Sequence, residues 1–268
     1  MAAVDIAAGA ALMDELTAII ARAAQAVRDR SATSALRSKP DGSPVTAADD
    51  AAEAVICDGL KALLPGVPII AEEAASRHKP DMAIGQGGGY FLVDPLDGTR
   101  EFVAGRDEYT INIALMGAGS PVLGLIAAPA LGLLWRGIVG SRAERMALGG
   151  GASSQPAPIR TRPRPSRDAV IMLSRSHLDA RTRAYVDDLA PAKVLQCGSS
   201  LKFCRVAEAA ADLYPRLAPT RDWDVAAGHA IVKAAGGEVT APDGSPLRYG
   251  TPDLAIPAFI ASGQPITA

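Results

Sequence analysis

A run without a single charged side chain extends over residues 111–135, in the middle of the chain. By length alone it could cross a bilayer as a helix. Glycine and proline break the run repeatedly, at Gly117, Gly119, Pro121, Gly124, Pro129 and Gly132. Such breaks favour buried strands joined by turns, and short connections favour antiparallel pairing. We therefore expect two or three antiparallel strands here, and no membrane span.

Helical and strand patterns precede this run. Residues 11–30 carry apolar side chains at helical spacing, which predicts a long amphipathic helix. Thr46 is a suitable cap for a second helix over residues 47–64. Strands are expected at residues 67–71 and 90–94. The first half of the chain thus combines helices with a mainly antiparallel sheet.

The second half has a different pattern. A segment rich in Gly, Ser, Pro and Arg, residues 149–167, lacks periodicity and is typical of a domain junction. Beyond it, apolar runs alternate with helical patterns, which favours a layered α/β arrangement. The apolar runs are 169–173 and 193–195, and the helical patterns are 178–189, 201–211 and 225–235. We expect an N-terminal α+β half over residues 1–148 and a C-terminal α/β half over residues 149–268. The arginine-proline stretch at 160–167 is interpreted as a solvated surface loop rather than a polyanion contact.

Composition narrows the choice of partners and compartment. The formal net charge is -2 and aromatic residues make up 4% of the chain, so neither a basic field nor a stacking surface for nucleic acid is expected. The three cysteines, Cys57, Cys197 and Cys204, match neither a zinc pattern nor a secreted disulfide framework. Their odd number favours a reducing, cytoplasmic location.

Two carboxylates follow the apolar start of residues 91–99. Asp94 and Asp97 lie on either side of a proline and a leucine, and we expect them to converge. At about 4 Å and an effective dielectric near 20, their repulsion is about 4 kcal/mol, which favours a bound cation or protonation. An ordinary Asp-Pro and Asp-Gly turn explains this stretch equally well. More acid at comparable positions favours the cation: Glu72 follows the strand at 67–71, and Asp224 opens a helix. Oxygen ligands of this kind suit magnesium, which often completes its shell with water and substrate phosphate.

Gly98 and Thr99 extend this acidic stretch toward a phosphate site. Glycine permits close approach of an anion, and a helix that begins at Thr99 presents free backbone N–H groups. The Thr99 hydroxyl could orient an attacking water, although an ordinary helix cap needs no such role.

With these residues, the chain resembles the inositol-monophosphatase superfamily. The two signatures of that superfamily are similar to the DPLDGT at residues 94–99 and the WDVAAG at residues 223–228. More closely, the chain resembles the CysQ branch of 3'(2'),5'-bisphosphate nucleotidases. Four further stretches carry this second resemblance: SPVTAAD at 43–49, SRSH at 174–177, GSSLKFC at 198–204 and YPR at 214–216.

The resemblance implies a fold and a set of site residues. The fold would be an α/β (α+β) structure with layered α-β-α-β-α order and the active site between two halves. Two or three Mg²⁺ ions would be held by the side chains of Glu72, Asp94, Asp97 and Asp224 and by the Leu96 carbonyl. Asp49 and Thr99 would activate water. Phosphate and substrate contacts would come from Gly98, Thr99, Arg175, His177, Ser199, Lys202 and Arg216.

The expected function is that of a magnesium-dependent phosphomonoesterase. By resemblance, it would hydrolyse 3'-phosphoadenosine 5'-phosphate to AMP and phosphate with a metal-activated water, would be lithium-sensitive, and would serve sulfur metabolism. An inositol monophosphatase or a fructose-1,6-bisphosphatase-like sugar phosphatase remains an alternative, as does a catalytically silent phosphate-binding protein. A monomer or homodimer is expected, with a small phosphorylated substrate as its partner.

Overall fold

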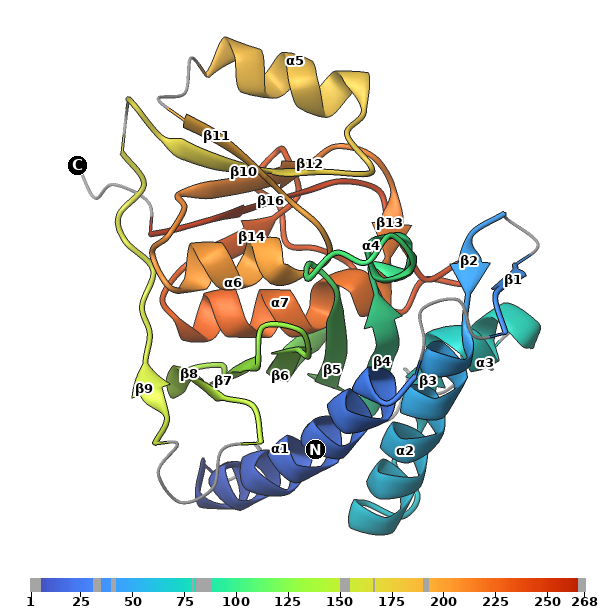
Figure 1. The fold of residues 1–268 in the computed structure, drawn as a ribbon. Coiled ribbons are helices and arrows are strands. Elements are labelled where there is room, and N and C mark those ends of the chain that lie inside the picture. Colours follow the sequence, from blue (N-terminus) through green and yellow to red (C-terminus); the bar gives the residue numbers. More distant parts are fainter. Residues whose placement is uncertain are drawn as a thin grey trace.

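The computed structural model describes residues 6–30, 35–39, 42–78, 80, 88–149, 155–165, 167–189 and 193–264. Helices and sheets alternate in α-β-α-β-α layers, with α1 and α2 at one side and α5 at the other (Figure 1). This order confirms the expected fold class. Among the described residues, no helix is long and apolar enough to cross a membrane.

The first layer consists of α1 (Ile6–Arg28) and α2 (Ala47–Leu63). Thr46 begins α2 as predicted, because its hydroxyl accepts a hydrogen bond from the Ala48 N–H, while Asp49 accepts one from the Thr46 N–H. The apolar faces of both helices pack on one face of the large sheet. This packing fixes the start of α2, and with it Asp49, beside the sheet.

The large sheet has the strand order β3-β4-β5-β6-β7-β8-β9. Its strands are β3 (Ile69–Ala71), β4 (Tyr90–Asp97), β5 (Thr110–Gly117), β6 (Ser120–Ala128), β7 (Leu133–Ile138), β8 (Arg142–Ala147) and β9 (Ala157–Pro158). Only the pair of β3 and β4 is parallel; the other neighbours are antiparallel. The uncharged run therefore forms antiparallel strands, as predicted.

The middle layer, α6 (Leu201–Ala207) and α7 (Asp222–Ala234), lies between the two sheets (Figure 1). One hydrophobic cluster joins side chains of the large sheet, of both helices and of the second sheet. The sequence pattern predicts a break at Gly124, but this residue lies within β6, where a Cβ atom would be 2.4 Å from the Ala227 carbonyl oxygen. Glycine is needed there because α7 approaches the strand backbone closely.

The second sheet has the order β11-β10-β12-β16-β14, and α5 (Ala180–Asp188) covers its outer face. Its strands are β10 (Val170–Ser174), β11 (Lys193–Cys197), β12 (Leu213–Arg216), β14 (Glu238–Thr240) and β16 (Phe259–Ser262). The boundary between residues 148 and 149 stays a prediction; α6 and α7, which follow it, pack against both sheets. The junction predicted at 149–167 contains β9, and its residues 150–154 and 166 lie outside the described residues.

Short elements complete the rim between the sheets. They are the hairpin of β1 (Arg37–Ser38) and β2 (Pro44–Val45), the helices α3 (Glu72–Arg77) and α4 (Thr99–Val103), and the pair of β13 (Thr220–Arg221) and β15 (Ala255–Ile256). The predicted helix at 201–211 ends early, at Ala207. After the cap residue Glu208, Ala209 takes a left-handed backbone conformation with φ of 61°, which cannot continue a helix.

Candidate active site

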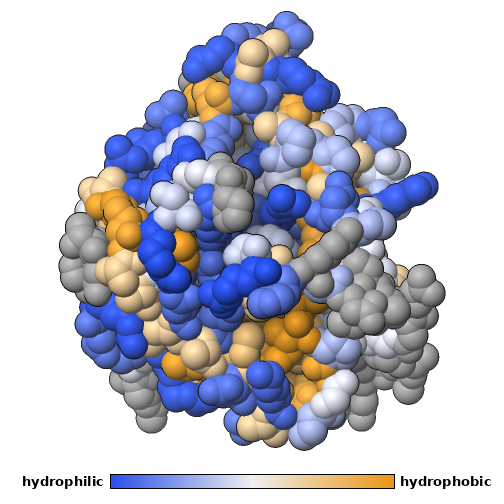
Figure 2. Space-filling model, turned by 90° about the vertical axis from the view of Figure 1, so that its right-hand side faces the viewer, coloured by the Kyte–Doolittle hydropathy of each residue, from blue (hydrophilic) through white to orange (hydrophobic). Residues whose placement is uncertain are grey.

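A cavity of about 290 Å³ opens between the halves. Its wall is built from the ends of β4 and β12, from α4, and from the first turns of α3, α6 and α7. On the side of the molecule that carries β2, α4 and β13, hydrophilic residues gather across the middle of the face (Figure 2). The cavity is lined by most of the predicted site residues: Glu72, Asp94, Leu96, Asp97, Gly98, Thr99, His177, Ser199, Lys202, Arg216 and Asp224.

Topology brings the four predicted carboxylates to this cavity. Glu72 directly follows β3 and Asp94 lies on the parallel neighbour β4, so both come to the same edge of the sheet. The register of β4 against β5 shifts between Asp94 and Asp97, which marks a β-bulge within the DPLDGT stretch. Asp224 reaches the cavity from the first turn of α7, in the other half.

Crowding of these acids changes their protonation. Burial raises the pKa of Asp94 well above its ordinary value, and the charges of Glu72 and Asp97 raise it further. Burial, reinforced by the charge of Asp224, raises the pKa of Asp97 to about 6. Burial also raises the pKa of Glu72 to about 7, despite the opposing effect of Lys39. The cluster therefore holds negative charge that a cation would relieve.

The residues present fit a magnesium site in their chemistry. All the donors are oxygens, and two of the carboxylates are tied to neighbouring backbone: Asp94 accepts the Leu96 N–H at 3.0 Å, and Asp97 accepts the N–H of Ser200. Across the described residues, His, Cys, Asp and Glu side chains do not gather in a group of three or more that could hold an ion. Water and substrate oxygens would have to complete the shell, as magnesium commonly requires.

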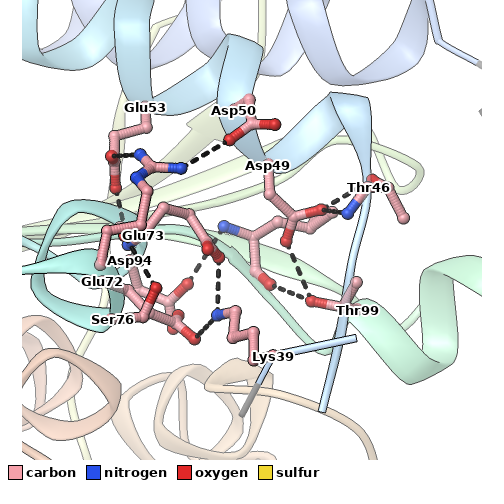
Figure 3. Close-up of polar contacts among 12 residues, drawn as sticks. Lys39, Thr46, Asp49, Asp50, Glu53, Glu72, Glu73, Ser76, Asp94 and Thr99 are labelled. Carbon is pink, nitrogen blue, oxygen red and sulfur yellow. Dashed lines mark hydrogen bonds and ion pairs between the residues drawn. The ribbon is translucent and has the colours of Figure 1, made fainter. Parts of the chain in front are cut away.

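Asp49 and Thr99 lie side by side although they are 50 positions apart in the chain. The Thr99 hydroxyl is 3.1 Å from Asp49 Oδ1 and 3.0 Å from the Leu96 carbonyl oxygen (Figure 3). The other oxygen of Asp49 accepts the N–H and the hydroxyl of Thr46. Burial raises the pKa of Asp49, and the hydrogen bonds from Thr46 and Thr99 oppose that rise. The structure thus joins the pair that the sequence resemblance assigned to water activation.

Lys39, which the sequence patterns did not single out, contacts the acidic cluster. Its ammonium nitrogen lies 2.5 Å from Glu72 Oε1 and 2.7 Å from Glu73 Oε1 (Figure 3). Burial lowers the pKa of Lys39, but the two glutamates outweigh burial and the net shift is upward. The β1–β2 hairpin that carries Lys39 therefore places a fixed positive charge against Glu72.

Asp224 is likewise held by its neighbours. Its Oδ2 accepts the Arg221 N–H at 3.1 Å and the Thr220 hydroxyl, and both donors come from β13. Neither donor was predicted, and their only sequence signal is their place just before the helix start.

Basic and polar groups also line the cavity. Lys202 is 2% exposed, and its ammonium donates to the carbonyl oxygens of Cys197, at 3.2 Å, and Ser199. Arg216 donates from Nη2 to the Pro219 carbonyl at 3.4 Å, while its buried Nε has no partner among the described residues.

Arg175 lies apart from this wall. It is exposed and is not among the lining residues, and its guanidinium forms two hydrogen bonds of 2.8 Å each with Glu108. Glu108 also accepts the Gly198 N–H at 2.9 Å. Arg175 therefore supports the loop before α6 through Glu108, and its predicted contact with substrate has no geometric support.

Comparisons with known proteins agree with this geometry. Residues 1–265 match the model of the inositol monophosphatase family. The chain is 45% identical over 215 residues to the 3'(2'),5'-bisphosphate nucleotidase CysQ of Escherichia coli strain K12, a match that covers 79% of this chain and 82% of that protein. The CysQ of Buchnera aphidicola is 38% identical over 225 residues, covering 84% and 80% of the two chains.

Solved structures show the same relationship. A crystal structure of CysQ from Bacteroides thetaiotaomicron, described as a bacterial member of the inositol monophosphatase family, aligns with a TM-score of 0.76 and 35% identity. The alignment covers 94% of this chain and 97% of that one. The protein is thus a phosphatase, and the chain belongs to the inositol monophosphatase family.

Proposed function

We propose that this phosphatase is a magnesium-dependent phosphomonoesterase that hydrolyses 3'-phosphoadenosine 5'-phosphate to AMP and phosphate. The observation that carries the proposal is the cavity itself, which is lined both by four carboxylates and by the cations Lys202 and Arg216. The names of the CysQ relatives support the same substrate class.

Two or three Mg²⁺ ions would be held by the side chains of Glu72, Asp94, Asp97 and Asp224 and by the Leu96 carbonyl. When bound, magnesium supplies positive charge that lowers the pKa of the attacking water and stabilises the leaving oxygen. The protein contributes pre-positioned oxygens: the Leu96 N–H orients Asp94, and β13 orients Asp224.

Thr99 and Asp49 would position the water. When the Thr99 hydroxyl donates to Asp49, its lone pairs stay free to accept a hydrogen bond from the water. Asp49 cannot turn away, because its other oxygen is held by two hydrogen bonds from Thr46. The pair therefore fixes the direction from which the water approaches, and Gly98 lets the phosphate come close to this turn.

The basic residues that line the cavity would bind the phosphate that is not cleaved. The Lys202 ammonium has three donors and gives two to backbone carbonyls, so one is left for a phosphate oxygen. The guanidinium-bearing Arg216 lines the same cavity, as do Ser199 and the flat ring of His177. A nucleoside bisphosphate has the two phosphates and the planar base that such a wall suits.

A substrate panel tests the proposal. Purified protein with magnesium would be given 3'-phosphoadenosine 5'-phosphate, inositol 1-phosphate and fructose 1,6-bisphosphate, and phosphate release would be followed. We expect the nucleotide to have the highest kcat/KM. A higher value for either of the others would instead support the inositol or sugar phosphatase alternative, and release from none of them would show that the substrate is another phosphomonoester. Lithium sensitivity, a cytoplasmic location, a role in sulfur metabolism and a monomeric or dimeric state stay predictions.

A further inference from the structure

Glu101 is a buried acid that the proposed reaction does not use. It lies in the first turn of α4, two positions after Thr99, and is 3% exposed. It nevertheless lines the cavity. Its Oε1 accepts the hydroxyl of Ser176, which comes from the other half of the chain. In the described part of the chain, Oε2 accepts no hydrogen bond. It is also not among the unpartnered polar atoms that are completely buried, so it remains accessible.

Two glycines leave room for this carboxylate. A Cβ atom on Gly98 would lie 3.4 Å from Glu101 Oε2, and one on Gly198 would lie 2.8 Å from its Cγ. Gly98 belongs to the DPLDGT signature and takes a φ of +88°, so it turns the chain directly before Thr99. The free oxygen of Glu101 therefore lies next to the turn where the scissile phosphate would bind.

Glu101 is not suited to attract an anionic substrate by charge. Burial and the charges of Arg216 and Arg100 lower the pKa of His177, whereas the charge of Glu101 raises it. Glu101 thus shares this part of the wall with cations that suit an anionic substrate. A carboxylate beside a phosphate is repulsive unless the substrate brings a hydrogen-bond donor to it, because an ionised carboxylate can only accept.

We propose that Glu101 accepts a hydrogen bond from a substrate hydroxyl on the carbon next to the phosphorylated carbon. This proposal rests on the proposed phosphomonoesterase function and adds the substrate class: phosphomonoesters of a vicinal diol, such as ribose. In a nucleoside 3',5'-bisphosphate the hydroxyl is the 2'-OH, and in a 2',5'-bisphosphate it is the 3'-OH. One acceptor beside the phosphate site serves both isomers, because each carries the hydroxyl on the neighbouring carbon.

Removal of the substrate hydroxyl tests this directly. A hydrogen bond to a charged group contributes about 1.5 to 3 kcal/mol, so kcat/KM for 2'-deoxyadenosine 3',5'-bisphosphate should be roughly 10- to 150-fold below that for the ribose compound. Glu101→Ala should bring this ratio to within about threefold of one, and Glu101→Gln, which keeps an oxygen but loses the charge, should give an intermediate ratio. Thermal melts establish that each variant is folded.

Ser176→Ala separates recognition from structure. This variant loses the link between the halves but keeps the carboxylate, so the ribose-to-deoxyribose ratio should stay above roughly tenfold. If the wild type hydrolyses both nucleotides equally, or if Glu101→Ala impairs both by the same factor, Glu101 has only a structural role. If neither nucleotide is hydrolysed, the proposed substrate is wrong, and this result leaves the role of Glu101 to be tested separately. The same variants are then compared on inositol 1-phosphate and cyclohexyl phosphate, where an unchanged ratio overturns the hydroxyl contact.

Discussion

The ammonium of Lys39 lies 2.5 Å from Glu72 Oε1, so one carboxylate of the proposed metal cluster already has a cationic partner from the protein. A bound magnesium ion must share Glu72 with this lysine. Lys39→Gln should lower the magnesium concentration that gives half-maximal activity by roughly 3- to 10-fold, which corresponds to about 0.6 to 1.4 kcal/mol. The metal-free variant should also melt at a lower temperature, because the acids repel each other more strongly.

Magnesium titrations of activity and of melting temperature check this prediction. Lys61→Gln, an exposed lysine near the end of α2, is a control of equal charge change. A Lys39 variant that needs more magnesium than the wild type would show that the ammonium supports the metal site instead of competing with it.

Asp94→Asn should reduce kcat by at least roughly 10³-fold without loss of the fold. Asp94 is 1% exposed and its pKa is strongly raised, so a neutral amide of similar shape relieves repulsion. The metal-free variant should therefore melt at or above the temperature of the wild type. Phosphate release and thermal melts measure the two effects, and near-native turnover would remove Asp94 from the proposed metal site.

Magnesium should stabilise the protein more at pH 8 than at pH 5.5. The pKa values of Glu72 and Asp97, about 7 and about 6, are raised in the folded protein. Between the ordinary acid pKa values and these raised ones, the folded metal-free state binds more protons than the unfolded state, so its stability falls as pH rises. Above pH 7 both acids are charged and free of competing protons. Melting curves with and without magnesium measure the difference, and an equal shift at both pH values would contradict the assignment.

Thr99→Ala and Asp49→Asn should each lower kcat by roughly 10² to 10⁴, with little change in KM. Their hydroxyl-to-carboxylate contact of 3.1 Å makes them one unit, so the double variant should lose little more than the worse single variant. A double variant whose loss equals the product of the two single losses would show independent roles.

Arg216→Ala should weaken the reaction of a bisphosphate far more than that of a monophosphate. Loss of a charge-assisted hydrogen bond corresponds to roughly 10- to 150-fold in kcat/KM. Lys202→Ala should impair both substrates, because this ammonium also holds the carbonyls of Cys197 and Ser199. Kinetics on 3'-phosphoadenosine 5'-phosphate and on inositol 1-phosphate distinguish the two variants. Equal losses on both substrates in Arg216→Ala would argue against the nucleotidase proposal.

Local sequence was sufficient for the parts of the site that lie within one stretch of chain. Asp94, Asp97 and Thr99 fall in a single strand and turn, and hydrophobic periodicity located the strands and helices around them. The contact between Glu101 and Ser176 joins residues 75 positions apart, and the Lys39 contact depends on how a hairpin folds over α3. No periodic pattern encodes such pairs, because they arise only when segments far apart in the chain pack together.

Packing also explains where sequence patterns misled. Glycine is typical of turns, but Gly124 lies in a strand and permits close packing of α7 on the sheet. Only the position of α7 reveals this role. The helical pattern at 201–211 continues past the true end of α6, because alanine favours a helix and no local feature marks Ala209 as the residue that takes the left-handed conformation. Arg175 has the charge expected of a phosphate contact but is paired with Glu108, a partner 67 positions away.

The close approach of α7 to β6 also determines how firmly the acids of the two halves are spaced. At Gly124 the helix meets the strand backbone without an intervening side chain, so no flexible layer lies between Ala227 and the sheet. Asp224 is one turn from that contact on the same helix, and Asp94 is on β4 in the same sheet. The spacing between the acids of the two halves is therefore set by direct contact between the backbones of α7 and β6. Asp224 and Asp94 thus depend on one packed core, and a densely packed core resists changes in the spacing of the elements that it joins.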